Sequence, residues 1–85
     1  MNIETAKSFL KELRELCIKH NAFISGCGCC ESPYARNKEG EYPYQNIKVE
    51  YEINEVIAYA DININDKWVT LRLDDNGYSI NTRWL

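Results

Sequence analysis

Three of the chain's four cysteines and two of its four glycines lie in one short stretch, Gly26-Cys27-Gly28-Cys29-Cys30-Glu31-Ser32-Pro33. Core packing does not require this density of thiols and glycines. We therefore take the stretch as the candidate functional site. Four kinds of chemistry fit these residue types and spacings, and the sequence leaves all four open.

The first is a loop that binds a small ligand, most simply an anion. Gly26 and Gly28 permit positive φ, which lets successive backbone N–H groups converge on one point. The small thiols allow a ligand to approach the backbone closely, and Ser32 adds a hydroxyl. The loop contains no lysine and does not match a Walker A sequence.

The second is a zinc site. Cys27 and Cys30 have the C-x-x-C spacing of tetrahedral zinc ligands, and Cys17 with His20 would complete a set of four. The spacing of the latter pair matches no common zinc motif, and Cys17 also fits an apolar helix stripe. We expect a fold that needs no metal.

The third is thiol chemistry at the same C-x-x-C pair, with His20 activating a thiolate. No second acid or base is placed by spacing, so we expect no catalytic residue, no enzyme and no cofactor. The fourth is structural: the thiols pack as small hydrophobic groups around a tight turn.

The connection after Pro33 is long and aromatic, and long loops are often binding loops or lids. Its tyrosine rings would close over a ligand or, alternatively, cover the edge of a sheet. On the first alternative, the ligand site consists of Gly26, Cys27, Gly28, Cys29, Cys30, Ser32, Tyr34, Tyr42 and Tyr44.

An amphipathic helix positions the start of this loop. Its apolar residues recur at three- and four-residue steps, at Ala6, Phe9, Leu10, Leu13, Leu16 and Cys17. Asn2 is a suitable N-cap, and Asn21 can adopt the left-handed conformation that ends a helix. The pattern predicts a helix from Ile3 to His20, followed by a short β-compatible segment at Ala22–Ser25.

Alternating polar and apolar residues predict four strands after the loop. The turns between them are Asn54-Glu55, Asn65-Asp66 and Asp75-Asn76-Gly77. The sets expected on the inward face are Ile47, Val49, Tyr51 and Ile53; Val56, Ala58, Ala60, Ile62 and Ile64; Val69, Leu71 and Leu73; and Tyr78, Ile80, Thr82 and Trp84.

These elements predict an α+β fold, with the N-terminal helix packed on a four- to five-stranded antiparallel meander. Ala22–Ser25 would supply the fifth strand. The opposite face of the sheet would carry aromatic and charged residues, which either form an ordinary solvated surface or bind a partner. Its members are Tyr59, Trp68, Arg72 and Arg83, beside Lys48, Glu50, Asp61 and Asn81.

Length and charge limit the class of protein. The 85 residues predict a single domain, 1–85, and the net charge is −3. Residues 41–85 hold four Lys or Arg against eight Asp or Glu, which argues against general nucleic-acid binding. The sequence shows no signal-peptide pattern and no membrane-spanning apolar run, so we expect a cytoplasmic protein with reduced thiols.

The helix ending at Lys19-His20, a short strand, and then Gly-Cys-Gly-Cys-Cys-x-Ser-Pro together resemble small uncharacterised proteins of phages and prophages. The resemblance covers about the first forty residues by motif. Those proteins often have Gly where this chain has Glu31, which weakens the case for an anion site there. The resemblance implies an accessory protein that counters host defence, either by sequestering a nucleotide-derived immune signal or by binding a host protein.

We therefore expect a non-enzymatic binding protein for a small nucleotide-like ligand. The alternative is a protein-interaction module that inhibits a host defence enzyme. We also expect a homodimer or higher homo-oligomer, because one helix covers only part of such a sheet.

Overall fold

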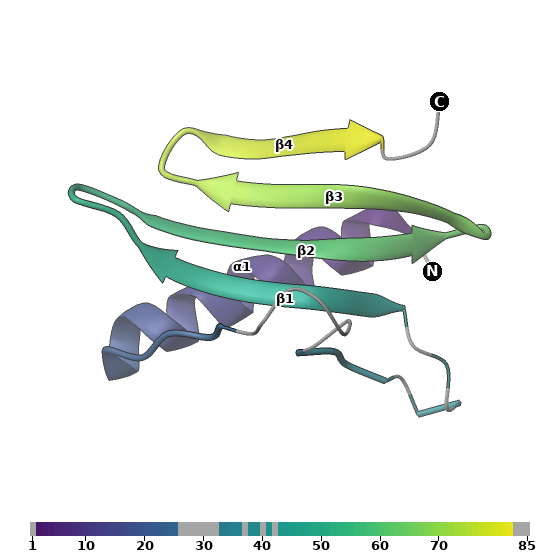
Figure 1. Ribbon diagram of the computed structural model, residues 1–85, viewed down its shortest axis with the longest axis horizontal. Helices are drawn as coiled ribbons and strands as arrows, with labels where there is room; N and C mark the ends of the chain where they lie inside the picture. Colours follow the sequence, from purple (N-terminus) through teal and green to yellow (C-terminus); the bar gives the residue numbers. More distant parts are fainter. Residues whose placement is uncertain (1, 26–32, 37, 40, 42, 83–85) are drawn as a thin grey trace.

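The structure, a computed structural model, describes residues 2–25, 33–36, 38, 39, 41 and 43–82. One helix packs on one face of a four-stranded antiparallel sheet in the order β1-β2-β3-β4, which confirms the predicted α+β meander (Figure 1). The elements are α1 (Ile3–His20), β1 (Tyr44–Tyr51), β2 (Val56–Ile64), β3 (Lys67–Asp74) and β4 (Gly77–Thr82).

Both ends of α1 have the caps that the sequence predicts. The side-chain Oδ1 of Asn2 accepts from the N–H of Thr5 at 2.8 Å. Asn21 is left-handed, with φ 51°, and ends the helix. The N–H of Ala22 then donates to the carbonyl of Cys17 at 2.9 Å, so that the last turn keeps a hydrogen-bond partner.

The core lies between α1 and the central strands. The helix contributes Ala6, Leu10 and Cys17, and the sheet contributes chiefly Val49, Ala58, Ala60, Ile62 and Leu71. The prediction that Leu16 belongs to this stripe is wrong, because its side chain is exposed. The C-terminal end of α1 projects past β1 in Figure 1, so a side chain one step around the helix from Cys17 no longer faces the sheet.

A β-bulge changes the phase of β1. Asn46 is left-handed, with φ 52°, and the pairing with β2 shifts between Gln45 and Lys48. Tyr44 and Ile47 are consequently both buried on the helix side, although they are three residues apart. The sequence pattern places Tyr44 in the preceding connection, whereas the strand begins there.

The connection between β1 and β2 corrects another expectation. Ile53, expected on the inward face, is 96% exposed. The strand ends at Tyr51, and the N–H of Glu52 donates to the carbonyl of Glu55 at 2.8 Å to close a turn. Ile57, on the outer side of β2, is buried instead.

The other two connections are the tight turns that the sequence predicts. Asn65 and Asp66 join β2 to β3, and both have positive φ, of 52° and 65°. Asp75 and Asn76 join β3 to β4. Gly77 follows with φ 111°, a conformation that strains any residue with a Cβ.

Candidate functional site

Most of the predicted ligand site lies outside the described residues. This holds for the prediction at Gly26, Cys27, Gly28, Cys29, Cys30, Ser32 and Tyr42. The structure describes the residues that flank the cysteine stretch, and it describes Tyr34 and Tyr44.

The described residues on either side of 26–32 are both hydrogen-bonded to the free edge of β1. Ile24 and Val49 exchange two backbone hydrogen bonds, of 3.1 and 3.0 Å. Two residues away on β1, the N–H of Ile47 donates to the carbonyl of Pro33 at 3.0 Å. The chain therefore leaves this edge at Ile24 and has returned to it at Pro33. Ile24 forms an isolated bridge, so Ala22–Ser25 supplies one pairing residue rather than a fifth strand.

The two described tyrosines of the predicted site lie in different environments. Tyr34 is exposed, and its neighbour Ala35 donates its N–H to the carbonyl of Tyr44 at 3.0 Å. The Tyr44 ring is buried and stacks on Phe9, with ring centroids 4.2 Å apart. Burial also raises the pKa of the Tyr44 hydroxyl. Tyr44 thus has the contacts of a core residue, while Tyr34 is accessible beside the segment.

Cys17 and His20, the remaining residues of the zinc and thiol hypotheses, do not share a surface. Cys17 is buried in the core, and burial raises the pKa of its thiol, whereas His20 is exposed. Within the described ranges, no three His, Cys, Asp or Glu side chains are grouped to hold a metal. Cys27 and Cys30 lie outside those ranges.

The outer face of the sheet carries a shallow depression of about 340 Å³, on the side away from α1. It is lined by the outer-face residues Tyr59, Thr70, Arg72, Ser79 and Asn81, and by Ile80, which lies between Ser79 and Asn81 in the edge strand. Tyr59 and Arg72 are cross-strand partners, so an aromatic ring and a guanidinium lie side by side in it. The predicted aromatic and arginine surface therefore forms one depression in the described residues, and Arg83 lies outside them.

The charges around this depression are locally balanced. The Lys48 ammonium lies 5.8 Å from the centre of the Tyr59 ring. Burial, and secondly the charge of Glu50, raise the pKa of the Tyr59 hydroxyl, so the phenol stays protonated. Arg72 forms an ion pair with Asp74 at 3.2 Å. The surface can stack an aromatic group and hydrogen-bond a polar one.

Asp61 is a buried carboxylate that the sequence pattern places on an ordinary solvated face. It is 7% exposed. Its two oxygens accept from Thr70 Oγ1 at 2.6 Å and from Asn46 Nδ2 at 2.8 Å. No sequence signal indicates this network, because the β-bulge that carries Asn46 over Asp61 is not visible in the alternation.

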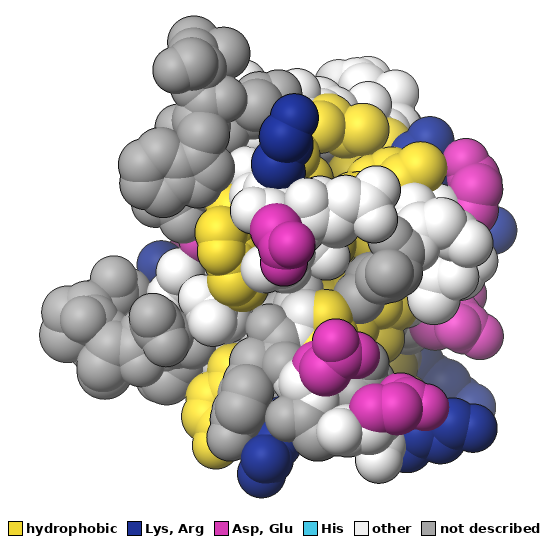
Figure 2. All heavy atoms as spheres, turned by 90° about the vertical axis from the view of Figure 1, so that its right-hand side faces the viewer, with side chains coloured by type: hydrophobic (Ala, Val, Ile, Leu, Met, Phe, Trp, Pro, Cys, Tyr) yellow, Lys and Arg dark blue, Asp and Glu magenta, His cyan; other side chains and the backbone are white. Residues whose placement is uncertain are grey.

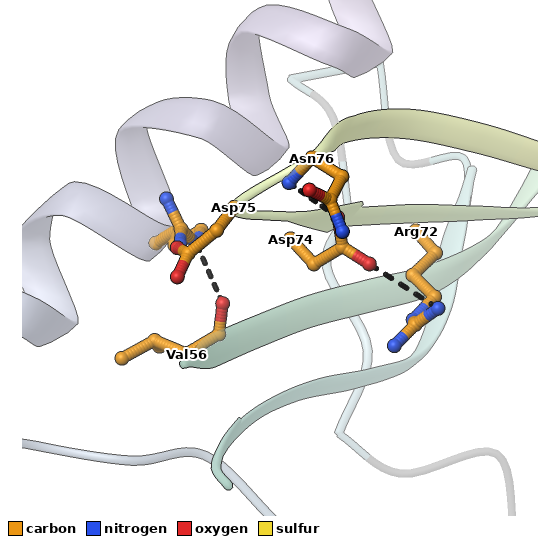
Figure 3. A network of polar contacts seen from close by, with 6 residues as sticks. Val56, Arg72, Asp74, Asp75 and Asn76 are labelled. Carbon is orange, nitrogen blue, oxygen red and sulfur yellow. Dashed lines mark hydrogen bonds and ion pairs between the residues drawn. The ribbon is translucent and has the colours of Figure 1, made fainter. Parts of the chain in front are cut away.

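Arg14 is a second residue whose role the sequence does not show. Its Nε donates to the carbonyl of Val56 at 2.8 Å, and its guanidinium pairs with Asp75. Figure 3 shows Val56 and Asp75 close together beside the helix. Near them, Asp74 accepts a hydrogen bond from the N–H of Asn76 and forms an ion pair with Arg72. Arg14 therefore joins α1 to the first residue of β2 and to the β3–β4 turn.

No protein-family model, curated protein sequence or solved structure matches this chain. The described part of the chain contains no helix that is long and apolar enough to cross a membrane. Figure 2 shows acidic and basic side chains interspersed at the end of the molecule where β1 begins, with no continuous basic patch among the side chains coloured there.

Proposed function

We propose that this chain is a non-enzymatic binding protein, and that residues 26–32 with Tyr34 hold a small nucleotide-like ligand. The observation that carries the proposal is the attachment of Ile24 and Pro33 to neighbouring outward positions of β1. Segments whose two ends are attached close together on a rigid element are frequent binding sites. The glycines and thiols in this segment suit a close approach of an anion to the backbone.

The side chain of Tyr34 is 53% exposed next to that segment, and in this proposal its ring stacks on a base of the ligand. Base–aromatic stacking contributes about 1–3 kcal/mol per base. We further propose, from the resemblance of the cysteine motif to phage and prophage proteins, an accessory protein of the host cytoplasm that sequesters a nucleotide-derived immune signal.

A thermal-shift screen of the purified chain against cyclic nucleotides and NAD-derived compounds tests this function. A ligand that binds only the folded state and is present at about 100 times its Kd stabilises the fold by about 2.7 kcal/mol. We expect at least one compound to raise the melting temperature by several degrees. No shift with any of them would contradict the proposal.

Two substitutions then locate the ligand. Gly28→Val should abolish the ligand-induced shift and leave the melting temperature of the free protein unchanged, since residue 28 lies outside α1 and β1–β4. Cys29→Ser is the matched control, because it conserves size and polarity, and it should keep most of the shift. Unfolding of Cys27→Ser and Cys30→Ser, or by EDTA, would favour zinc instead.

The second candidate function is a protein-interaction module that inhibits a host defence enzyme. The depression beside Tyr59 and Arg72 favours it, because tyrosine and arginine are enriched at the centres of protein interfaces. Capture of a host enzyme that Arg72→Ala weakens at least about tenfold, a loss of about 1.4 kcal/mol, would support this function. Equal capture by the wild type and Arg72→Ala would exclude this face.

A further inference from the structure

The two edges of the sheet differ in their hydrogen bonding. In an antiparallel ladder, successive residues direct their N–H and C=O alternately toward one neighbour and toward the other. On β1 the N–H of Ile47 bonds to Pro33, both backbone groups of Val49 bond to Ile24, and the carbonyl of Tyr44 accepts from Ala35. From Tyr44 to Val49, the edge of β1 is therefore bonded to other parts of the same chain.

The edge of β4 is open in the described residues. The two-residue connection at Asp75-Asn76 makes Asp74 and Gly77 a hydrogen-bonded pair, so Ser79 and Asn81 also bond to β3. Tyr78, Ile80 and Thr82 must direct their N–H and C=O away from β3. No described backbone group beyond β3 bonds to Tyr78 or Ile80.

The composition of β4 does not protect this edge. Natural edge strands commonly carry lysine, proline or a bulge, which prevent pairing with another chain. The strand reads Gly77-Tyr78-Ser79-Ile80-Asn81-Thr82, with no charge and no proline, and it pairs with β3 without a register shift. In Figure 1 it lies at the side of the sheet away from the C-terminal end of α1.

The helix side of β4 is apolar and incompletely covered. The Tyr78 hydroxyl donates to the carbonyl of Lys7 at 3.0 Å, and the Tyr78 side chain is 38% exposed. Ile80, two residues along the same face, is 50% exposed. Closely packed contacts of α1 are with β2 and β3, so apolar surface remains beside the open edge.

We propose that a second copy of this chain pairs with this edge, β4 against β4, about a two-fold axis at Ile80. Ile80 then stands opposite Ile80 of the second copy, Tyr78 opposite Thr82, and Ser79 opposite Asn81. Each side chain of β4 then meets one of similar polarity. Because β4 carries no charged residue, no like charges oppose each other across this interface, although each chain has a net charge of −3.

The axis is perpendicular to the sheet, so this pairing places both helices on the same side of a continuous sheet. The exposed Ile80 side chains of the two copies then cover each other between the helices. The pairing uses the N–H and C=O groups of Tyr78, Ile80 and Thr82 that β3 leaves free, and it goes beyond the proposed ligand function.

Light scattering of matched variants tests the interface. We expect the wild type to have the mass of two chains at about 200 µM, since edge interfaces of this small size are weak. Ile80→Lys places two ammonium groups opposite each other, and we expect it to raise the dissociation constant at least about tenfold. Ile53→Lys makes the same change at a side chain that is 96% exposed and lies in the β1–β2 connection, outside the paired strand, and it should remain dimeric.

Hydrogen exchange of the wild type provides a test that needs no variant. Raising the protein concentration should slow exchange of the Tyr78 and Ile80 amides, whereas the Ser79 and Asn81 amides, bonded to β3, should be slow throughout. A monomer at all concentrations would overturn the proposal. So would a dimer that Ile80→Lys does not weaken, or a dimer in which the Ile80 amide exchanges as it does in the monomer.

Discussion

Arg14 connects three elements through one side chain. Its Nε–H bonds to the carbonyl of Val56, and its guanidinium pairs with Asp75 in the β3–β4 turn. The Arg14 side chain is largely buried and its bond to Val56 is part-buried, whereas Asp75 is 55% exposed, so solvent screens the ion pair more than the bond to Val56. Its position on the polar side of the helix pattern gives no hint of them.

Replacing Arg14 should therefore destabilise the fold. We expect Arg14→Ala to lower the free energy of unfolding by about 2 kcal/mol, because hydrogen bonds to charged groups contribute about 1.5–3 kcal/mol each. Lys11→Ala, at an exposed position of the same helix, should change it by less than about 0.5 kcal/mol. Urea unfolding followed by circular dichroism measures both, and equal effects would contradict the assigned role.

Asp61 is the second residue whose contribution we can isolate. Asp61→Ala removes the acceptor of both Thr70 and Asn46, and an unsatisfied buried donor costs about 1–3 kcal/mol. Adding Thr70→Val to Asp61→Ala should then cost little more, because one of the stranded donors is removed with it. If the loss of stability of the double variant, measured by urea unfolding, equals the sum of the losses of the two single variants, the hydrogen bond between Thr70 and Asp61 is not the source of the loss.

At the scale of elements, the bulge in β1 sets which side chains reach the core. Asn46 holds a left-handed φ of 52° and lets Tyr44 and Ile47 face the same side. We expect Asn46→Ile to destabilise more than Asn46→Gly. Both lose the hydrogen bond to Asp61, but only isoleucine is strained at positive φ. Equal unfolding free energies for the two variants would mean that the bulge relaxes without cost.

The elements that follow a regular period are the ones that sequence patterns predict. The helix from Ile3 to His20, with its caps at Asn2 and Asn21, follows from a 3.6-residue apolar repeat and from local capping chemistry. The tight turns at Asn65-Asp66 and before Gly77 follow from residues that tolerate positive φ.

What the patterns do not predict depends on contacts between distant residues. The bulge at Asn46 breaks the two-residue period, so Tyr44 is misplaced and the Asp61 network is not visible. The exposure of Leu16 depends on where α1 passes the edge of the sheet. Of the candidate site, the sequence predicts the residue types, and the structure adds the attachment of Ile24 and Pro33 to β1.

At the scale of the whole molecule, a buried thiol and a buried phenol predict how stability depends on pH. Burial raises the pKa of the Cys17 thiol and the Tyr44 hydroxyl. The folded state then holds these protons more tightly than the unfolded chain does. The corresponding stability is fully present below the ordinary pKa values and is lost as pH rises through the folded ones.

We therefore expect the free energy of unfolding to be flat near neutral pH and to fall above about pH 9, where cysteine and tyrosine ordinarily ionise. Cys17→Val removes the thiol's share, so its curve should begin to fall at higher pH than that of the wild type. Urea unfolding from pH 7 to the alkaline limit of two-state behaviour measures this. A curve for Cys17→Val that parallels the wild type would assign the loss to other groups.

The occupied edge of β1 sets an upper limit on assembly. Ile24, Pro33 and Ala35 already bond to outward groups of β1. With the proposed pairing, each subunit would therefore offer one open side among the described strands, at β4, and would have a valence of one. Units of valence one terminate each other, whereas units with two open sides add strands indefinitely. Removing the hydrogen bonds at Ile24 and Pro33 would raise the valence to two. The same chain would then be a candidate for filaments, and its self-recognition would become an aggregation hazard.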